Sequence, residues 1–174
     1  MNKTMTLEKL NLLSRTQAAI ALSECCGSSQ WAKMMSMKKP FLVEEDLFKA
    51  ADAIWQRLSP ADWKEAFSHH PKIGNIKSLR EKFASTKAWA EGEQSGANGA
   101  SDETLQQLAS SNDEYENRFG YIFIVCATGK SAEEMLALLR QRLHNQPAEE
   151  LCIAAEEQRK ITRLRLNKLL GISS

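Results

Sequence analysis

One histidine in this sequence stands where it can serve as an acid or a base. His70 precedes Pro71, and proline disfavours helical geometry in the residue before it, so we expect a helix to end at His70. Trp63 and Phe67, at helical spacing from His70, should share its side of that helix, whereas His69 should point about 100° away. An imidazole in this place can exchange a proton near neutral pH. The alternative is a helix-terminal histidine that only hydrogen-bonds a free carbonyl.

A carboxylate lies in a second stretch, Trp89-Ala90-Glu91-Gly92-Glu93-Gln94. Glu93 follows Trp89 by four residues, so the carboxylate and the large ring should share one face of a helix. Such a carboxylate is either half-buried, where its surroundings set its affinity for a proton, or it extends into solvent. On a helix the solvated state is the more common of the two, and Glu91 is the better candidate for it.

The third candidate is an apolar run, Arg118 to Ala127. Its β-like part, Tyr121 to Cys126, has no partner strand elsewhere in the sequence, so we expect a buried extended or partly helical segment and no sheet. The backbone N–H and C=O groups of such a segment must find partners, and a small polar ring can supply them. The alternative, favoured by composition alone, is a core segment satisfied by neighbouring side chains.

The elements that position these residues all read as helices. Ser14 with Gln17 forms a capping box, and Gly27 is expected to close the helix that follows. Apolar residues recur with a helical period from about Glu44, and Ser59-Pro60 is a strong helix start. Further helices are expected over 76–83, from 85, over 101–120, from 131 to about 144 and over 147–171, with Met37 to Pro40 as a connector. The sequence predicts an all-α protein, a single compact multi-helix domain over residues 1–174, with one extended or irregular apolar segment near residues 120–127.

Composition excludes several classes of function. The chain has 23 Lys and Arg against 22 Asp and Glu, so it carries no large field for nucleic acid or a charged membrane, although the basic stretch Lys160, Arg163 and Arg165 needs its own explanation. No run approaches the roughly 20 apolar residues of a membrane span, and no signal peptide is apparent. The four cysteines, Cys25, Cys26, Cys126 and Cys152, lack metal-site spacing. We therefore expect a cytoplasmic protein with buried thiols and no metal.

Several stretches resemble one known family in order and in spacing. They are Leu22 to Ser28 with Trp31, Pro40-Phe41, His70-Pro71, Glu93-Gln94, Phe119-Gly120 with the apolar run after it, Arg142 to Asn145, and Lys160 to Leu166. In this combination the chain resembles the decarboxylases of 2-oxo-4-hydroxy-4-carboxy-5-ureidoimidazoline (OHCU), which give (S)-allantoin in urate breakdown. The resemblance extends from near the N-terminus to the last expected helix.

The resemblance implies a homodimeric helical enzyme that uses neither metal nor organic cofactor. It makes His70 the catalytic acid and Glu93 its catalytic partner, with OHCU as the small-molecule substrate. The substrate-binding residues that it implies are Pro71, Ala90, Gln94, Phe123, Ile124, Val125, Cys126, Ala127 and Arg165.

Two departures from the family pattern affect the expected site. Many members have a serine where this chain has Ala90, which implies one fewer side-chain contact to substrate. Many also have an acidic residue where Lys72 stands, so no role is assigned to that position. The main alternative function is a non-catalytic helical interaction module. A metal hydrolase is the weaker alternative, because His69 and His70 cannot face one ion from a regular helix and only His144 remains.

Overall fold

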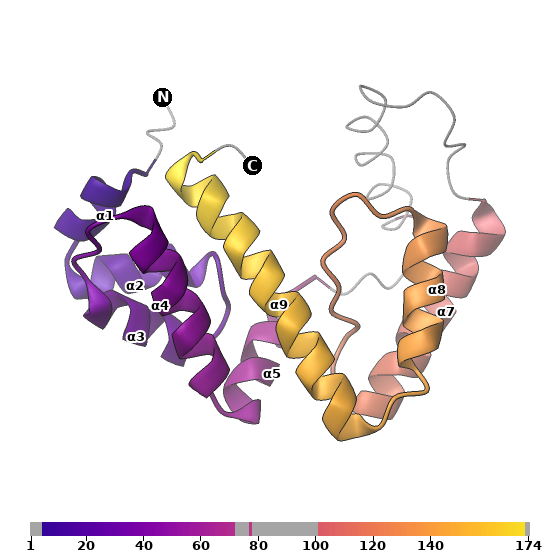
Figure 1. Cartoon of the computed structure of the whole chain (residues 1–174). Coiled ribbons are helices and arrows are strands. Elements are labelled where there is room, and N and C mark those ends of the chain that lie inside the picture. The colour runs from indigo at the N-terminus through magenta and orange to yellow at the C-terminus, as the bar shows by residue number, and fades with distance from the viewer. Residues whose placement is uncertain (1–4, 72–76, 78–100, 173–174) are drawn as a thin grey trace. The chain divides into compact units, whose positions relative to one another are not determined.

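A computed structural model describes residues 5–71, 77 and 101–172 of the chain (Figure 1). Within this described part, helix is the only regular secondary structure, which confirms the predicted all-α class. These described residues group into two compact units: those within 1–70 and 155–174 form one, and those within 71–154 form the other. The expectation of one domain over residues 1–174 stays a prediction.

The first unit is the larger set of helices. It contains α1 (Leu7–Leu12), α2 (Arg15–Ser23), α3 (Ser29–Lys38), α4 (Glu44–Arg57), α5 (Pro60–Ser68) and the C-terminal part of α9 (Pro147–Leu170). The second unit contains α7 (Asp102–Phe119), α8 (Ala132–Arg142) and the first residues of α9.

The helix starts follow the capping signals in the sequence. Ser14 and Gln17 form the predicted capping box at α2, in which the Ser14 hydroxyl accepts from the Gln17 N–H at 3.2 Å. The cap at Ser59 is followed by proline in the first turn of α5, as expected. Ser131 caps α8 together with Glu134. Such caps satisfy N–H groups that the helix itself leaves without partners, which is why sequence locates these starts well.

Two predicted helix ends were wrong by a few residues. Helix α2 stops at Ser23, before the expected Gly27, and α5 stops at Ser68, before His70. Gly27 has a different role, because a Cβ at this position would lie 2.6 Å from the Cβ of His69. The missing side chain lets the connection between α2 and α3 approach the end of α5. The connector after α3 also begins later than predicted, because α3 continues to Lys38.

Three tryptophans hold the helices of the first unit together. The indole N–H of Trp31 donates to the carbonyl of Ala51 at 3.1 Å, and that of Trp55 donates to the carbonyl of Ala155 at 2.9 Å. Trp63 donates to the carbonyl of Trp55 at 3.0 Å. Each bond satisfies a polar group on a large apolar ring, so the rings can pack inside the unit at little polar cost. Together they tie α3 to α4, α4 to α9 and α5 to α4.

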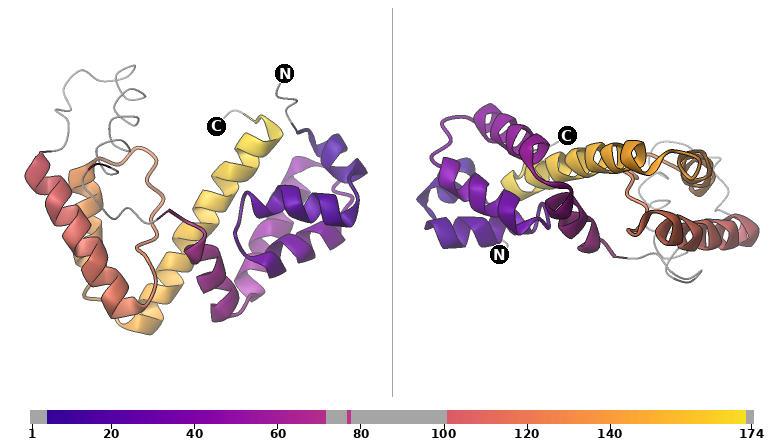
Figure 2. Two further views of the ribbon diagram at one scale, coloured as in Figure 1. Left: turned by 180° about the vertical axis from the view of Figure 1, so that it is seen from behind. Right: turned by 90° about the horizontal axis from the view of Figure 1, so that it is seen from below.

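In the second unit, α7 and α8 lie side by side in both views of Figure 2. Gly120 ends α7 with a left-handed conformation (φ 81°), as the sequence predicted. The chain then runs without regular structure through residues 121–127, which confirms the predicted irregular segment. Figure 1 shows this connection returning along α7, so that α8 begins at the same end as α7.

The cysteines meet the expectation only in part. All four are free thiols; Cys25 and Cys26 are buried and Cys126 is half-buried. Cys152 is exposed, so the expectation of buried thiols is wrong there: the buried positions of α9 on either side of it are Glu150 and Ala154.

Two further classes of feature are absent from the described residues. These residues form no group of three or more His, Cys, Asp or Glu side chains that could hold a metal ion. Within the same ranges, no helix is both long enough and apolar enough to cross a membrane.

Candidate functional site

His70 lies just past the end of α5, where the chain leaves the helix. His69 caps the helix, and the His70 N–H donates to the carbonyl of Phe67 at 3.2 Å. The His70 ring is half-buried, and its Nε2 lies 2.5 Å from Oε1 of Gln158 on α9. The neighbouring His69 is exposed. The two histidines therefore have different surroundings, as their order around the helix end predicted.

The partner of His70 belongs to a polar pair on the inner face of α9. Gln158 is fully buried and Thr162, one helical turn later, is 5% exposed, while Leu166 continues the same face as an apolar residue. The Gln158 amide donates to the Thr162 hydroxyl at 3.2 Å. Buried polar side chains cost free energy unless they are hydrogen-bonded, so this pair is stable because each member has a partner.

Arg165 lies half-buried on α9, three residues after Thr162. Burial raises the pKa of the Cys25 thiol to about 12 and that of the Cys26 thiol to about 11, and the positive charge of Arg165 opposes the rise at both. His70, Gln158 and Thr162 are thus joined by hydrogen bonds, and the charge of Arg165, farther along the same helix, acts on the two buried thiols.

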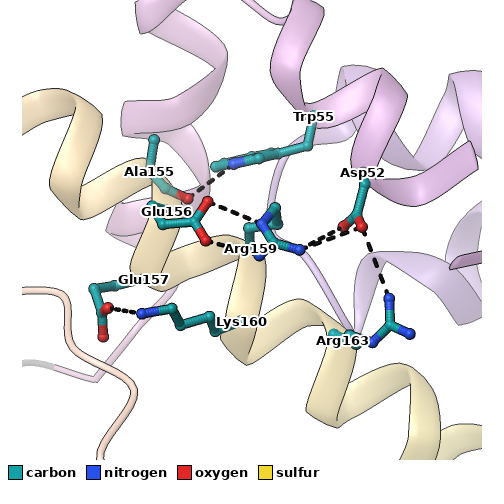
Figure 3. A network of polar contacts seen from close by, with 8 residues as sticks. All are labelled: Asp52, Trp55, Ala155, Glu156, Glu157, Arg159, Lys160 and Arg163. Atoms are coloured by element: carbon teal, nitrogen blue, oxygen red, sulfur yellow. Dashed lines mark hydrogen bonds and ion pairs between the residues drawn. The ribbon is translucent and has the colours of Figure 1, made fainter. Parts of the chain in front are cut away.

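A second polar network lies on another face of α9 and joins it to α4 (Figure 3). Arg159 donates to both carboxylate oxygens of Asp52 at 3.2 Å and also pairs with Glu156 at 2.7 Å. Arg163 lies 3.7 Å from Asp52. Lys160 pairs with Glu157 at 2.6 Å. Two residues of the basic stretch, Lys160 and Arg163, therefore take part in ion pairs. Arg165 does not take part in them.

The predicted binding segment, Phe123 to Ala127, belongs to the second unit and is anchored there by Arg142. The Arg142 guanidinium donates to the carbonyl of Ile124 at 2.7 Å and lies 4.5 Å from the centre of the Phe123 ring. The same guanidinium donates to one oxygen of Glu150 through two nitrogens, at 2.7 and 2.5 Å. Ile124 is buried and the rest of the segment is half-buried.

The pair of Arg142 and Glu150 is itself buried and fully surrounded. Glu150 is not exposed at all, and its two oxygens accept from Tyr115 and, at 2.9 Å, from Asn145. Burial and the Glu150 carboxylate raise the pKa of the Tyr115 hydroxyl, so this group remains a neutral donor. No role was predicted from the sequence for Arg142, Glu150 or Tyr115. The available signal was the stretch Arg142 to Asn145, which matched the family without a stated function.

The structure describes only some of the predicted site residues. In the first unit, His70 contacts Gln158 on α9, and Arg165 lies half-buried farther along the same helix. Pro71, directly after His70, is exposed, and the segment 123–127 lies in the second unit. Glu93, Ala90, Gln94 and Lys72 lie outside the described residues, as do the helices expected over 76–83 and from 85.

Comparisons with known proteins agree on one family. Residues 11–167 match the family model described as OHCU decarboxylase. The chain is 44% identical to the "Uric acid degradation bifunctional protein TTL" of Arabidopsis thaliana over 149 residues, which cover 84% of this chain and 45% of that protein. It is 29% identical to the 2-oxo-4-hydroxy-4-carboxy-5-ureidoimidazoline decarboxylase of Amia calva over 132 residues, 76% of this chain and 75% of that one. The chain thus spans less than half of the plant relative.

The chain is also similar to a solved structure from this family. A crystal structure of an OHCU decarboxylase in the presence of (S)-allantoin is 42% identical to this chain, with a TM-score of 0.68. The match covers 86% of this chain and 96% of the solved one.

Proposed function

Because the chain belongs to the OHCU decarboxylase family, we propose that it removes CO2 from OHCU and releases (S)-allantoin. The observation that carries the proposal is the match over residues 11–167, within which His70 lies half-buried on a short bond to a buried amide. A relative of 42% identity was crystallised in the presence of (S)-allantoin, which supports a small ureido-ring compound as the substrate class.

The chemistry of OHCU suits a protein that supplies only acid–base groups. Its carboxylate is attached to a carbon that bears a hydroxyl and adjoins a C=N bond. When the bond to the carboxylate breaks, the electron pair can pass into this imine, which is the role that pyridoxal or thiamine has in other decarboxylases. CO2 leaves and an enol-like intermediate remains. A proton must then reach the neighbouring ring carbon from one face to give a single enantiomer.

His70 is the proposed general acid for this proton transfer. A positioned side chain in this role typically contributes about 10²- to 10⁴-fold in rate. Glu93 is proposed to orient the substrate hydroxyl or share its proton, and to favour departure of the carboxylate by repulsion between like charges. Arg165 is proposed to hold the substrate by paired hydrogen bonds, for which a planar guanidinium is better shaped than an ammonium.

The remaining predicted contacts would fix the ring. Backbone groups of Phe123 to Ala127 are proposed to bind its polar edge, with Pro71, Ala90 and Gln94 as further contacts. Support comes from the backbone of residues 121–127, which is irregular and so has no helical partners for its N–H and C=O groups. Arg142 already takes the carbonyl of Ile124, so the other backbone groups of the segment are the candidates for the ring.

The proposal includes a cytoplasmic homodimer with neither nucleic acid nor membrane as a partner. The near balance of 23 basic and 22 acidic residues supports the absence of a nucleic-acid partner. The dimer follows from the family resemblance. Light scattering should give twice the chain mass of 19.5 kDa, and a monomer at micromolar concentration would contradict it.

The test uses fresh OHCU, formed from urate by uricase and 5-hydroxyisourate hydrolase. Circular dichroism then follows the appearance of optically active allantoin. Addition of this protein should speed the signal well above the spontaneous rate. A trace no faster than the protein-free control would favour the alternative function, a non-catalytic interaction module.

A further inference from the structure

The inner face of α9 contains an amide where an apolar side chain would be expected. Gln158 is fully buried, between Ala155 and Leu166, which are 4% and 0% exposed. A buried amide costs several kcal/mol in an apolar environment unless its N–H and C=O groups are hydrogen-bonded, with about 2–7 kcal/mol as the usual range. Gln158 meets this cost with two bonds, one to His70 and one to Thr162. Its position is therefore explained by what it binds.

These two bonds have a defined direction. The Gln158 Nε2 group donates to the Thr162 hydroxyl at 3.2 Å, so the Oε1 atom faces His70 at 2.5 Å. An amide oxygen can only accept a hydrogen bond, and a neutral imidazole has one nitrogen with hydrogen and one without. The nitrogen of His70 that faces Gln158, Nε2, must therefore carry the hydrogen.

We propose that Gln158 is a positioning residue for His70: it holds the neutral imidazole as the Nε2–H tautomer and fixes the plane of the ring. The inference rests on the proposed acid role of His70. Gln158 acts through the histidine and does not itself contact the reacting atoms. Its separation of 88 residues from His70 means that only the fold brings the two together.

The first test reads the tautomer directly. Nitrogen-15 NMR distinguishes the protonated from the unprotonated ring nitrogen, and the chain has only three histidines, so a His70→Asn variant identifies the signals of His70. At a pH where the ring is neutral, His70 should be the Nε2–H form, and Gln158→Met should convert it to a mixture. An Nδ1–H form in the unmodified protein, or an unchanged tautomer in folded Gln158→Met, would overturn the inference.

The second test measures turnover. Gln158→Met should lower kcat by about tenfold or more with little change in KM, because the ring loses its alignment while substrate binding remains. Gln158→Glu keeps an acceptor for Nε2–H and should recover most of the lost kcat. Gln56→Met, at an exposed position of α4, is the matched control and should change neither constant. Equal loss in the Glu and Met variants would show a structural role only.

The two proposals fail separately. If the protein does not turn over OHCU but His70 shows the Gln158-dependent tautomer, only the proposed function is lost. If turnover is normal and the tautomer does not depend on Gln158, only the positioning role is lost. Should Gln158→Met not fold, Thr162→Val gives the same NMR measurement, since it releases the Gln158 amide to rotate; an unchanged tautomer there would contradict the inference.

Discussion

Two adjacent histidines in this chain have opposite surroundings, and the cause is local. His69 caps α5 and packs its side chain over Gly27, where a Cβ would clash at 2.6 Å. His70, one residue later, turns toward α9 and reaches Gln158. A glycine on one side and a buried amide on the other therefore decide which imidazole is held in a fixed position. His69 can therefore serve as the control for substitutions of His70.

Arg165 should affect substrate affinity more than the chemical step. Replacing it by lysine keeps the charge but removes the paired hydrogen bonds. Loss of a hydrogen bond to a charged group costs about 1.5–3 kcal/mol, so KM should rise roughly ten- to hundredfold in steady-state assays with OHCU. Arg163→Lys is the control, because Arg163 pairs with Asp52 on another face of α9. Equal effects of the two changes would remove the assignment of Arg165.

Glu93 is the proposed partner of His70 and should matter in kcat. Glu93→Gln keeps the size of the side chain but removes its charge and its capacity to take a proton, so kcat should fall by about 10²-fold or more. Glu91→Gln changes a carboxylate two residues away and should leave kcat within a factor of two or so. Stopped-flow detection of allantoin measures both. A Glu93→Gln enzyme as active as Glu91→Gln would end this assignment.

At the scale of elements, a buried ion pair holds an irregular segment in place. The pair of Arg142 and Glu150 connects α8 to the start of α9, and Arg142 also binds the carbonyl of Ile124. A segment without regular structure has no ladder of its own, so its position depends on such side-chain bonds. The position of the proposed ring-binding backbone therefore depends on this ion pair.

Removing one member of the ion pair between Arg142 and Glu150 should lower the free energy of unfolding substantially. Arg142→Met leaves the fully buried Glu150 carboxylate without its cation, and removing one partner of a buried pair typically costs about 3–5 kcal/mol. Arg140→Met, at an exposed position of the same helix, should cost no more than about 1 kcal/mol. Urea unfolding followed at 222 nm compares the two. Similar losses in both variants would mean that the ion pair does not anchor the segment.

The helices could be predicted from sequence because their signals are local. Caps such as Ser59 and Ser131 and the stop at Gly120 each act within one turn, and the structure has all three where expected. The irregular segment 121–127 was also predicted, since an apolar run between two helix signals had no partner strand.

The residues that hold the site residues in place could not be predicted from such local signals. Gln158 and Glu150 look in sequence like ordinary polar residues of a long surface helix, and α9 shows no pattern that separates them from Glu156 or Glu157. Their partners are 88 residues away for Gln158 and 35 residues away for the bond of Glu150 to Tyr115. Periodicity reports which face of a helix is apolar, but it does not report which distant side chain fills a position on that face.

For the whole molecule, the buried thiols predict loss of stability at alkaline pH. The pKa of Cys26 rises from an ordinary 9.0 to about 11, and that of Cys25 to about 12. Above pH 9 an unfolded chain releases these protons while the folded protein keeps them. The stability that the two thiols contribute is therefore fully present below pH 9, and it is lost as the pH rises from 9 toward 11.

Chemical unfolding at a series of pH values checks this. The free energy of unfolding should decline through that window, and Cys26→Ala should make the decline shallower. Cys152→Ala, at the exposed cysteine, should leave the slope unchanged. A slope that is the same in Cys26→Ala and in the unmodified protein would mean that this thiol titrates equally in both states.

The central claim, that one imidazole carries the proton transfer of a decarboxylation needing no other cofactor, is tested most directly by comparing two variants on fresh OHCU. His70→Asn and His69→Asn remove adjacent rings of the same size. Turnover of His70→Asn should fall by about 10²- to 10⁴-fold with the far-UV spectrum unchanged, while His69→Asn should stay close to the unmodified protein. A folded His70→Asn protein that forms (S)-allantoin at a near-normal rate would contradict the account.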